Sequence, residues 1–110
     1  MKVIKIGAMW CPGCIVMHKV WDKINKEYPN IEVKSLDLDM DEEEVKKYNI
    51  GDTLPVIIFY KDDTELERLI GEKKFEDIES VIKMYEYIKE IFINFFISNI
   101  IFNISSISKR

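Results

Sequence analysis

The sequence predicts an α/β fold whose strands and helices follow one another in the order βαβαββα. Apolar runs of strand length alternate with segments whose apolar residues recur at helical spacing, and this alternation predicts strands joined by helical crossovers. The chain has 110 residues, of which 47% are hydrophobic and 33% charged, a composition typical of one globular domain with a single core.

The first half of the chain predicts two strands joined by a long helix. Val3 to Ala8 forms a short buried strand, and the segment Pro12 to Tyr28 has the spacing of an amphipathic helix that Pro29-Asn30 ends. Ile31 to Leu38 then forms the second strand. Because a helical crossover joins the two strands, we expect them to pair in parallel. The apolar helix face consists of Met17, Trp21, Ile24 and Tyr28.

The second half predicts a short helix, a hairpin and a final helix. Asp41 to Glu44 places acidic side chains in the first turn of a helix that ends near Tyr48, where they complement the helix dipole. The segments that follow are a turn at Gly51–Pro55, a strand at Val56–Tyr60, a loop at Lys61–Thr64, a strand at Glu65–Ile70 and a closing Gly71. The final helix should pack on the sheet through residues that recur at helical spacing, namely Phe75, Ile78, Ile82, Tyr85, Ile88 and Phe92.

The C-terminal residues differ in composition from the rest. We expect residues 1–90 to form the domain and residues 91–110, rich in Ile, Phe, Asn and Ser, to form an extension that continues the last helix. Polar residues interrupt its apolar run before the about 18 residues that a membrane span needs. Its apolar side is expected to pack on the domain or to support self-association. The alternative is that this extension is poorly matched to the fold and prone to aggregate.

Charge and targeting signals narrow the partners and the compartment. The net charge of −4 gives no electrostatic reason to bind nucleic acid. No uninterrupted apolar segment follows Met1-Lys2, so we expect no secretory signal and a cytoplasmic location. In a reducing compartment, two cysteines three positions apart favour a catalytic or metal-binding role over a structural bridge.

The run Trp10-Cys11-Pro12-Gly13-Cys14 lies between a predicted strand and a predicted helix. At a helix N-terminus, backbone N–H groups stabilise a thiolate, which makes Cys11 the expected attacking nucleophile. Cys14 lies one turn inward on the same side, where it can resolve a mixed disulfide. Pro12 suits the first helical turn, and Gly13 permits the close approach of a partner backbone.

Metal sites are the competing interpretation of these residues. Zinc usually takes four ligands, and His18 is the single histidine of the chain, so we expect no metal. The run Asp37-x-Asp39-x-Asp41 has the start of a calcium loop, but Glu42 occupies the position that requires glycine. We interpret the acidic run as a helix cap, and His18 as a half-exposed structural residue rather than a proton shuttle.

The chain resembles the thioredoxin family. The residues that carry the resemblance are the first strand, the run Trp10 to Cys14, the tripeptide Thr53-Leu54-Pro55, the strand Val56–Tyr60 and Gly71. The match extends from Lys2 to about Glu90, and the short N-terminus resembles the minimal form of the fold shared with glutaredoxins. The resemblance implies a four-stranded mixed sheet of order 2-1-3-4 flanked by helices.

The resemblance also implies a site and its partners. Pro55 should be cis and stand beside the cysteines, Leu54 should offer its backbone to an extended substrate, and Trp10 should cover the site. The implied redox centre is the Cys11-Cys14 disulfide with no other cofactor, and the implied partners are protein disulfides and a donor of the thioredoxin reductase type. The implied substrate-binding residues are Trp10, Pro12, Gly13, Thr53, Leu54, Pro55 and Gly71.

Two departures from the family pattern leave the mechanism open. Lys5 occupies the position at which thioredoxins carry a buried aspartate, where it either acts on the cysteines or reaches the surface. The dipeptide between the cysteines has proline first, as in glutaredoxins. We therefore expect a thiol–disulfide oxidoreductase, foremost a protein disulfide reductase. A glutathione-dependent reductase and a binding module without turnover are the alternatives.

Overall fold

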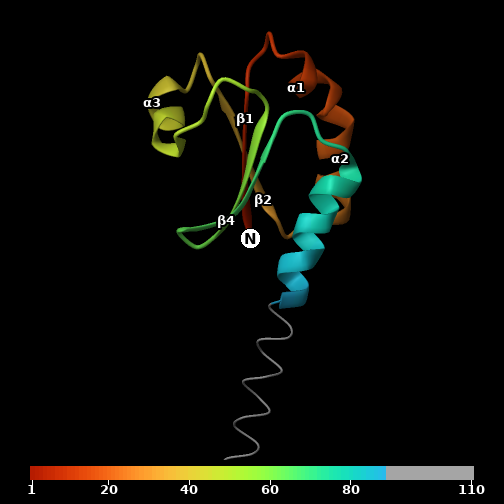
Figure 1. Cartoon of the computed structure of the whole chain (residues 1–110). Helices are drawn as coiled ribbons and strands as arrows, with labels where there is room; N and C mark the ends of the chain where they lie inside the picture. Colours follow the sequence, from red (N-terminus) through yellow and green to blue (C-terminus); the bar gives the residue numbers. More distant parts are fainter. Residues whose placement is uncertain (89–110) are drawn as a thin grey trace, which may run out of the picture. The chain divides into compact units, whose positions relative to one another are not determined.

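The strands form one four-stranded sheet in the order β2-β1-β3-β4. The structure is a computed structural model in which residues 1–88 are described (Figure 1). The parallel pairing of the first two strands and the sheet order are as predicted. The strands are β1 (Lys2–Gly7), β2 (Glu32–Asp37), β3 (Val56–Lys61) and β4 (Thr64–Ile70). The helices are α1 (Pro12–Val16), α2 (His18–Glu27), α3 (Glu42–Val45) and the 3₁₀ turn η1 (Lys46–Tyr48), followed by a helix over 75–88.

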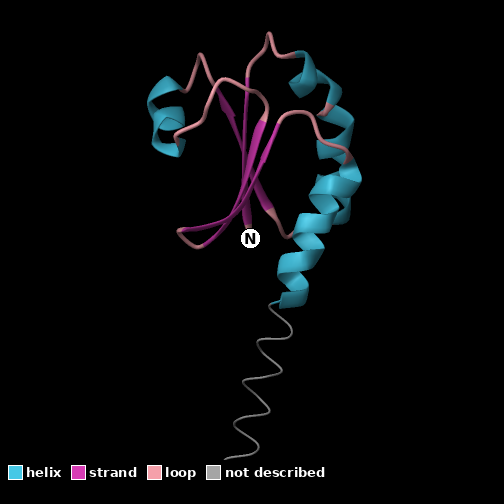
Figure 2. Ribbon diagram, viewed as in Figure 1, coloured by secondary structure: helices cyan, strands magenta, loops and turns pink. Residues whose placement is uncertain are grey.

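The sheet carries a core on each of its faces. Strand β1 pairs in parallel with β2 and antiparallel with β3, so it is covered along both edges. Figure 2 shows α1 and α2 on one side of the sheet and α3 on the other. Because successive strand residues point to opposite faces, Ile4 and Ile6 pack with Val45 of α3, whereas Lys5 and Gly7 face α1 and α2.

The predicted single helix from Pro12 to Tyr28 consists of two helices that meet at Met17. The backbone of Met17 adopts φ −80° and ψ 0°, which interrupts the regular helix, and its side chain is buried. Nothing in the local sequence marks this break. The second helix ends at Glu27 because Pro29 disfavours helical geometry at Tyr28, which adopts φ −126° and ψ 64°.

Residues with left-handed backbone follow η1 and β3. The predicted helix from Asp41 to Tyr48 becomes α3 followed by η1, and Asn49 ends η1 at φ 50°. Asp62 adopts φ 55° in the hairpin, so the predicted four-residue loop narrows to a two-residue turn between β3 and β4. Asn and Asp tolerate this backbone region better than other L-residues.

The chain divides into two compact units, Met1–Ile78 and a second that begins at Glu79. Ile78 is fully buried in the first unit, and the Nζ atom of Lys23 lies 4.0 Å from the centre of the Phe75 ring. The predicted extension 91–110 and the predicted helix contact of Phe92 lie outside the described residues. Within residues 1–88, no helix has both the length and the apolarity to cross a membrane.

Candidate active site

The two cysteines meet where β1 turns into α1. Cys11 is the N-cap of α1 with extended backbone, and Pro12 occupies the first helical turn. The sulfur atoms of Cys11 and Cys14 form a disulfide, with the two Cα atoms 5.3 Å apart. The backbone N–H of Cys14 donates a hydrogen bond of 3.2 Å to the Sγ atom of Cys11. This donor favours negative charge on the Cys11 sulfur.

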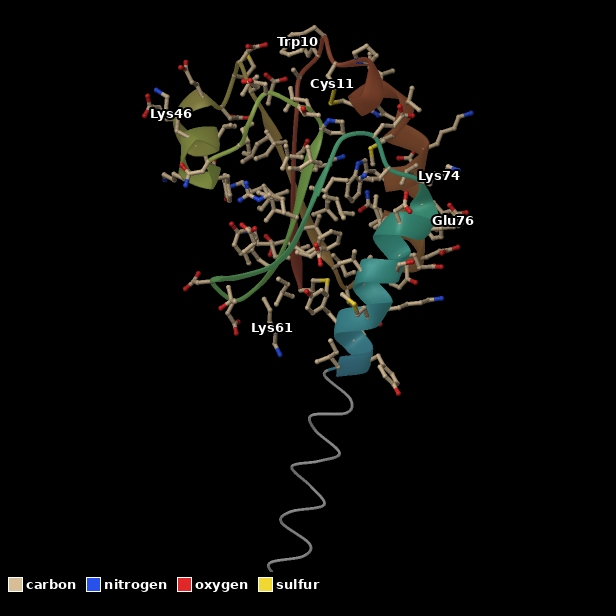
Figure 3. The ribbon with its side chains drawn as sticks, viewed as in Figure 1. Trp10, Cys11, Lys46, Lys61, Lys74 and Glu76 are labelled. Atoms are coloured by element: carbon tan, nitrogen blue, oxygen red, sulfur yellow. A yellow bond between two sulfur atoms is a disulfide. The ribbon has the colours of Figure 1, made fainter. Side chains whose placement is uncertain are left out.

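The two cysteines and the residues before them differ in how far they are exposed to solvent. Figure 3 labels Trp10 and Cys11 at the start of α1. Cys11 is only 3% exposed, and Cys14 is half-buried. The preceding Met9 and Trp10 are 85% and 62% exposed. The Cys11 N–H donates to the carbonyl of Ala8 at 3.1 Å, and this hydrogen bond closes a turn. Met9 and Trp10 lie at the exposed tip of that turn. The sequence pattern did not distinguish the accessibility of the two cysteines.

The loop before β3 brings Pro55 next to the cysteines. The Leu54-Pro55 bond is cis, as the family resemblance implies. A Cβ atom on Gly13 would lie 3.3 Å from the Cδ atom of Pro55, so the loop packs directly on the start of α1. The N–H of Gly71 donates to the carbonyl of Pro55 at 2.8 Å. The loop is therefore held between α1 and the end of β4.

The two residues before Pro55 differ in how far they are buried. The side chain of Leu54 packs against the core on the α3 side of the sheet, so it is turned away from the cysteines. Thr53 is exposed in the same loop. Gly71 adopts φ 92°, a conformation that L side chains rarely take, so the chain can turn back toward Pro55 there.

Trp10 is positioned by an acidic residue that the sequence interpretation did not assign to the site. Its Nε1 atom donates to the Oδ2 atom of Asp39 at 2.8 Å. Asp39 is held in turn because its N–H and that of Met40 donate to the Oδ1 atom of Asp37 at 2.8 and 3.0 Å. The alternating Asp-x-Asp pattern could have indicated such a turn, because Asp side chains often accept hydrogen bonds from nearby backbone.

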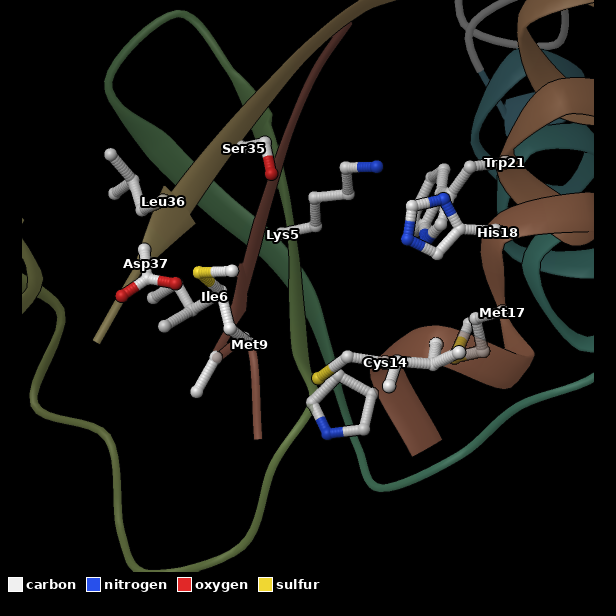
Figure 4. Close-up of a pocket in the computed structure, with 14 residues that line it drawn as sticks. Lys5, Ile6, Met9, Cys14, Met17, His18, Trp21, Ser35, Leu36 and Asp37 are labelled. Carbon is white, nitrogen blue, oxygen red and sulfur yellow. The ribbon is translucent and has the colours of Figure 1, made fainter. Parts of the chain in front are cut away.

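A pocket of about 380 Å³ lies beside Cys14, between the sheet and the helices α1 and α2 (Figure 4). Lys5 extends into it from β1, and its Nζ atom lies 5.0 Å from the centre of the Trp21 ring. Partial burial lowers the pKa of Lys5, while the carboxylate of Asp22 opposes that shift. Lys5 is half-buried, so it is not simply directed to the surface, and the exposed His18 lines the same pocket.

Metal ligands are not gathered at this site. Among residues 1–88, no group of three or more histidine, cysteine, aspartate and glutamate side chains is arranged to hold a metal ion. The acidic side chains of the 37–41 segment instead accept backbone hydrogen bonds, such as that from the Asp37 N–H to the Oδ2 atom of Asp41 at 2.9 Å. The acidic run therefore organises the loop that follows β2.

A sheet of this order, with a cysteine pair at the first strand-to-helix turn and a cis proline beside it, defines a protein of the thioredoxin-fold class with a C-x-x-C disulfide. The family model for thioredoxin matches residues 1–84, and the chain belongs to the thioredoxin family.

Individual relatives agree with this assignment. Thioredoxin H5 of Oryza sativa subsp. japonica is 31% identical over 90 residues, covering 76% of this chain and 65% of the rice protein, just under two thirds of its length. The thioredoxin of Chlamydia trachomatis is 29% identical, covering 74% of this chain and 76% of its own length. Among solved structures, thioredoxin-2, a component of the malaria parasite protein secretion machinery, superposes with a TM-score of 0.71 at 31% identity, covering 76% of this chain and 81% of that chain.

Proposed function

We propose that this protein reduces disulfides in other proteins through the Cys11-Cys14 pair. The observation that carries the proposal is the position of Cys11 as the N-cap of α1, with Cys14 one turn inward and Pro55 alongside. The hydrogen bond from the Cys14 N–H favours the thiolate of Cys11 in the reduced protein. Cys11 is the proposed nucleophile and Cys14 the proposed resolving thiol.

The proposed reaction has two exchange steps. The Cys11 thiolate attacks one sulfur of a substrate disulfide, and the other substrate sulfur leaves as a thiolate that takes a proton from solvent. The Cys14 thiolate then attacks the Cys11 sulfur, and the second substrate sulfur leaves. The substrate gains two electrons and two protons, and this protein ends as the disulfide seen in the structure.

Substrate binding is proposed to use backbone and a small surrounding surface. An extended substrate segment would pair with the backbone beside Leu54, in the manner of strand addition. The exposed Trp10, fixed by Asp39, offers an apolar wall next to the cysteines. The residues proposed to complete this surface are Pro12, Gly13, Thr53 and Gly71, together with Pro55, which is buried in the oxidised protein.

The donor, the compartment and the domain boundary are part of the proposal. A donor of the thioredoxin reductase type would return the disulfide to the dithiol in the cytoplasm. Residues 1–90 would form the catalytic domain, with residues 91–110 as an extension able to support self-association. Size-exclusion chromatography of the full chain and of a chain that ends at Glu90 tests that last point, because equal elution as a monomer would exclude it.

A glutathione-dependent reductase is the second candidate. Glutaredoxin-3 of Mus musculus is 30% identical over 69 residues, covering 63% of this chain and 20% of that protein. An assay of glutathione mixed disulfides, run beside an insulin assay, separates the two candidates. Stronger turnover of the glutathione mixed disulfide would favour the glutaredoxin-like activity.

Insulin reduction with dithiothreitol as donor tests the main proposal. The purified protein should accelerate precipitation of the insulin B chain, and Cys11→Ser should abolish that acceleration. Cys14→Ser, the matched control, should retain attack and accumulate a mixed disulfide with insulin that mass spectrometry detects. Unchanged turnover in Cys11→Ser contradicts the assignment of the nucleophile, and turnover at the uncatalysed rate in the unmodified protein contradicts the function.

A further inference from the structure

A second groove lies on the α3 side of the sheet and starts beside the redox pair. It has a volume of about 500 Å³, and its walls include Trp10, which precedes Cys11, and Leu54, which precedes the cis Pro55. Clefts of about 300–1,000 Å³ are typical of ligand-binding sites. Because Trp10 and Leu54 also belong to the surface proposed to bind substrate, the groove is continuous with that surface.

The wall of the groove is largely apolar. Four of its residues belong to one buried cluster or pack against it, namely Leu38, Val45, Ile50 and Leu54. The side chain of Trp10 is 62% exposed, and its Nε1 atom donates to Asp39, so the ring is held in place without being covered. An exposed aromatic ring beside half-buried apolar side chains forms a surface that an apolar side chain of a partner can cover.

The charge along the groove is negative. Residues 37–52, which supply most of its lining, include seven acidic and two basic side chains. Of the described residues that line the groove, Lys46 alone is basic. Its Nζ atom lies 3.6 Å from a carboxylate oxygen of Glu42 and 3.9 Å from one of Glu43, so its charge is offset within the chain.

The other charged residues near the groove do not reverse this balance. Asp52 lines the groove and is exposed. Arg68 approaches from β4, where its Nη1 atom donates to the carbonyl of Asn49 at 3.3 Å, but its Nη2 atom lies 2.7 Å from a carboxylate oxygen of Glu65. A cation that enters the groove therefore meets an excess of negative charge.

We propose that the groove selects substrate proteins in which an apolar side chain and a lysine or arginine lie a few residues from the disulfide. The apolar side chain covers the wall between Trp10 and α3, and the basic side chain faces Glu42 and Asp52. Exposed ion pairs add little affinity at physiological salt, but complementary charge raises the rate of encounter. The selection therefore appears in the rate of reduction at low ionic strength.

This inference rests on the proposed reduction of protein disulfides and names the class of its substrates. If the proposed function is wrong, the insulin assay fails and none of the peptides below is reduced faster than in the uncatalysed reaction. If only the inference is wrong, insulin is reduced and the peptides react at equal rates. The two failures are therefore distinguishable.

The first experiment compares peptides cyclised by a disulfide that differ only outside their two cysteines. The second residue outside each cysteine is leucine or alanine, and the third is lysine or glutamate. Stopped-flow tryptophan fluorescence follows oxidation of the reduced full chain by each peptide and gives a rate constant. Each rate constant is divided by that of the same peptide with dithiothreitol, which removes differences in the intrinsic reactivity of the disulfide.

The leucine–lysine peptide should react about 10-fold faster than the leucine–glutamate peptide at about 0.01 M ionic strength, and the ratio should fall toward 1 at about 1 M. Alanine in place of leucine should slow the lysine peptide about 10-fold, because the apolar wall stays uncovered. A lysine-to-glutamate ratio of 1 at low salt would overturn the inference and would favour a groove covered by a second copy of this chain. Equal rates with leucine and alanine would overturn it as well.

The second experiment locates the selection with variants of the groove. Asp52→Lys reverses a charge on the wall and should lower the lysine-to-glutamate ratio about 10-fold. Glu42→Gln removes a carboxylate and releases Lys46 from a partner 3.6 Å away, so it should also lower the ratio, though less. This second variant supplies the test if Asp52→Lys does not fold.

The matched control for charge is Asp63→Lys. Asp63 is exposed in the turn between β3 and β4, and this variant carries the same change in net charge. Figure 3 shows Trp10 and Lys46 toward one end of the sheet and Lys61, which leads into that turn, at the other. The ratio should keep its wild-type value in Asp63→Lys. An unchanged ratio in the groove variants, or an equal fall in Asp63→Lys, would overturn the inference.

Discussion

Gly7→Ala tests the contact between β1 and the Cys14 sulfur. The new Cβ atom would lie 2.7 Å from the Sγ atom and 3.4 Å from the Cβ atom of Cys14. Gly7 cannot easily retreat, because it pairs with Asp37 of β2 and its carbonyl accepts the N–H of Leu38 at 2.8 Å. The sulfur must therefore move, and overpacking of this kind typically costs about 1–3 kcal/mol.

The cost depends on the redox state. In the oxidised protein the Cys14 sulfur is fixed by its bond to Cys11, whereas in the dithiol Cys14 can adopt another rotamer. The gain of about 0.4–1 kcal/mol from a less flexible unfolded chain applies to both states and cancels between them. Selective destabilisation of the disulfide by about 1–3 kcal/mol corresponds to a reduction potential raised by about 20–60 mV.

A redox titration against glutathione buffers, followed by tryptophan fluorescence, measures this shift. Gly51→Ala is the matched control, because a Cβ atom there would meet nothing within 4 Å, so its potential should equal that of the wild type. A potential for Gly7→Ala that is unchanged within about 10 mV, equivalent to about 0.5 kcal/mol, would refute the steric argument. A more negative potential would refute it as well.

Three further predictions concern stability. Phe59→Ala removes a fully buried ring from β3 and should lower the free energy of unfolding in urea by about 3–5 kcal/mol; a loss below about 1 kcal/mol would contradict its place in the core. Gly71→Ala forces a side chain onto φ 92° and should cost about 1–2 kcal/mol in the same assay, whereas an increase in stability would exclude that backbone geometry. Burial, aided by the charge of Glu65, raises the pKa of Tyr60 in the folded protein. The contribution of Tyr60 to stability is therefore fully present below about pH 10, the pKa in the unfolded chain, and is lost as pH rises through the pKa in the folded protein. Tyr60→Phe should therefore flatten the fall in stability above about pH 10, and equal slopes in both proteins would contradict this reasoning.

Strands and the reactive pair could be predicted from the sequence because their signals are local. Val56 to Phe59 is an uninterrupted apolar run, which is typical of a strand buried on both faces, and all four residues are buried. The C-x-x-C spacing places two sulfurs on one side of a helical turn whatever the rest of the fold, and Cys11 and Cys14 form the disulfide. The cis form of the Leu54-Pro55 bond followed from the family resemblance and not from local physics.

Other features depend on residues that are distant in the sequence. The break at Met17 has no local signal, and its Sδ atom accepts the backbone N–H of Lys73 at 3.5 Å, a residue 56 positions away. Asp39 fixes Trp10 from 29 positions away. Propensity and periodicity describe the neighbours of a residue along the chain, so they cannot report contacts of this range.

The sequence by itself determined the kind of chemistry, because a thiol pair at a strand-to-helix turn needs only local geometry to become reactive. Tertiary structure alone decided how far each cysteine is buried and which residues surround it. Cys11 is 3% exposed in the oxidised protein, while the sulfur of Cys14 lies against Gly7, and Cys14 lines a pocket that Lys5 also lines. Accessibility and electrostatic environment arise when separate segments pack together, and no single segment encodes them.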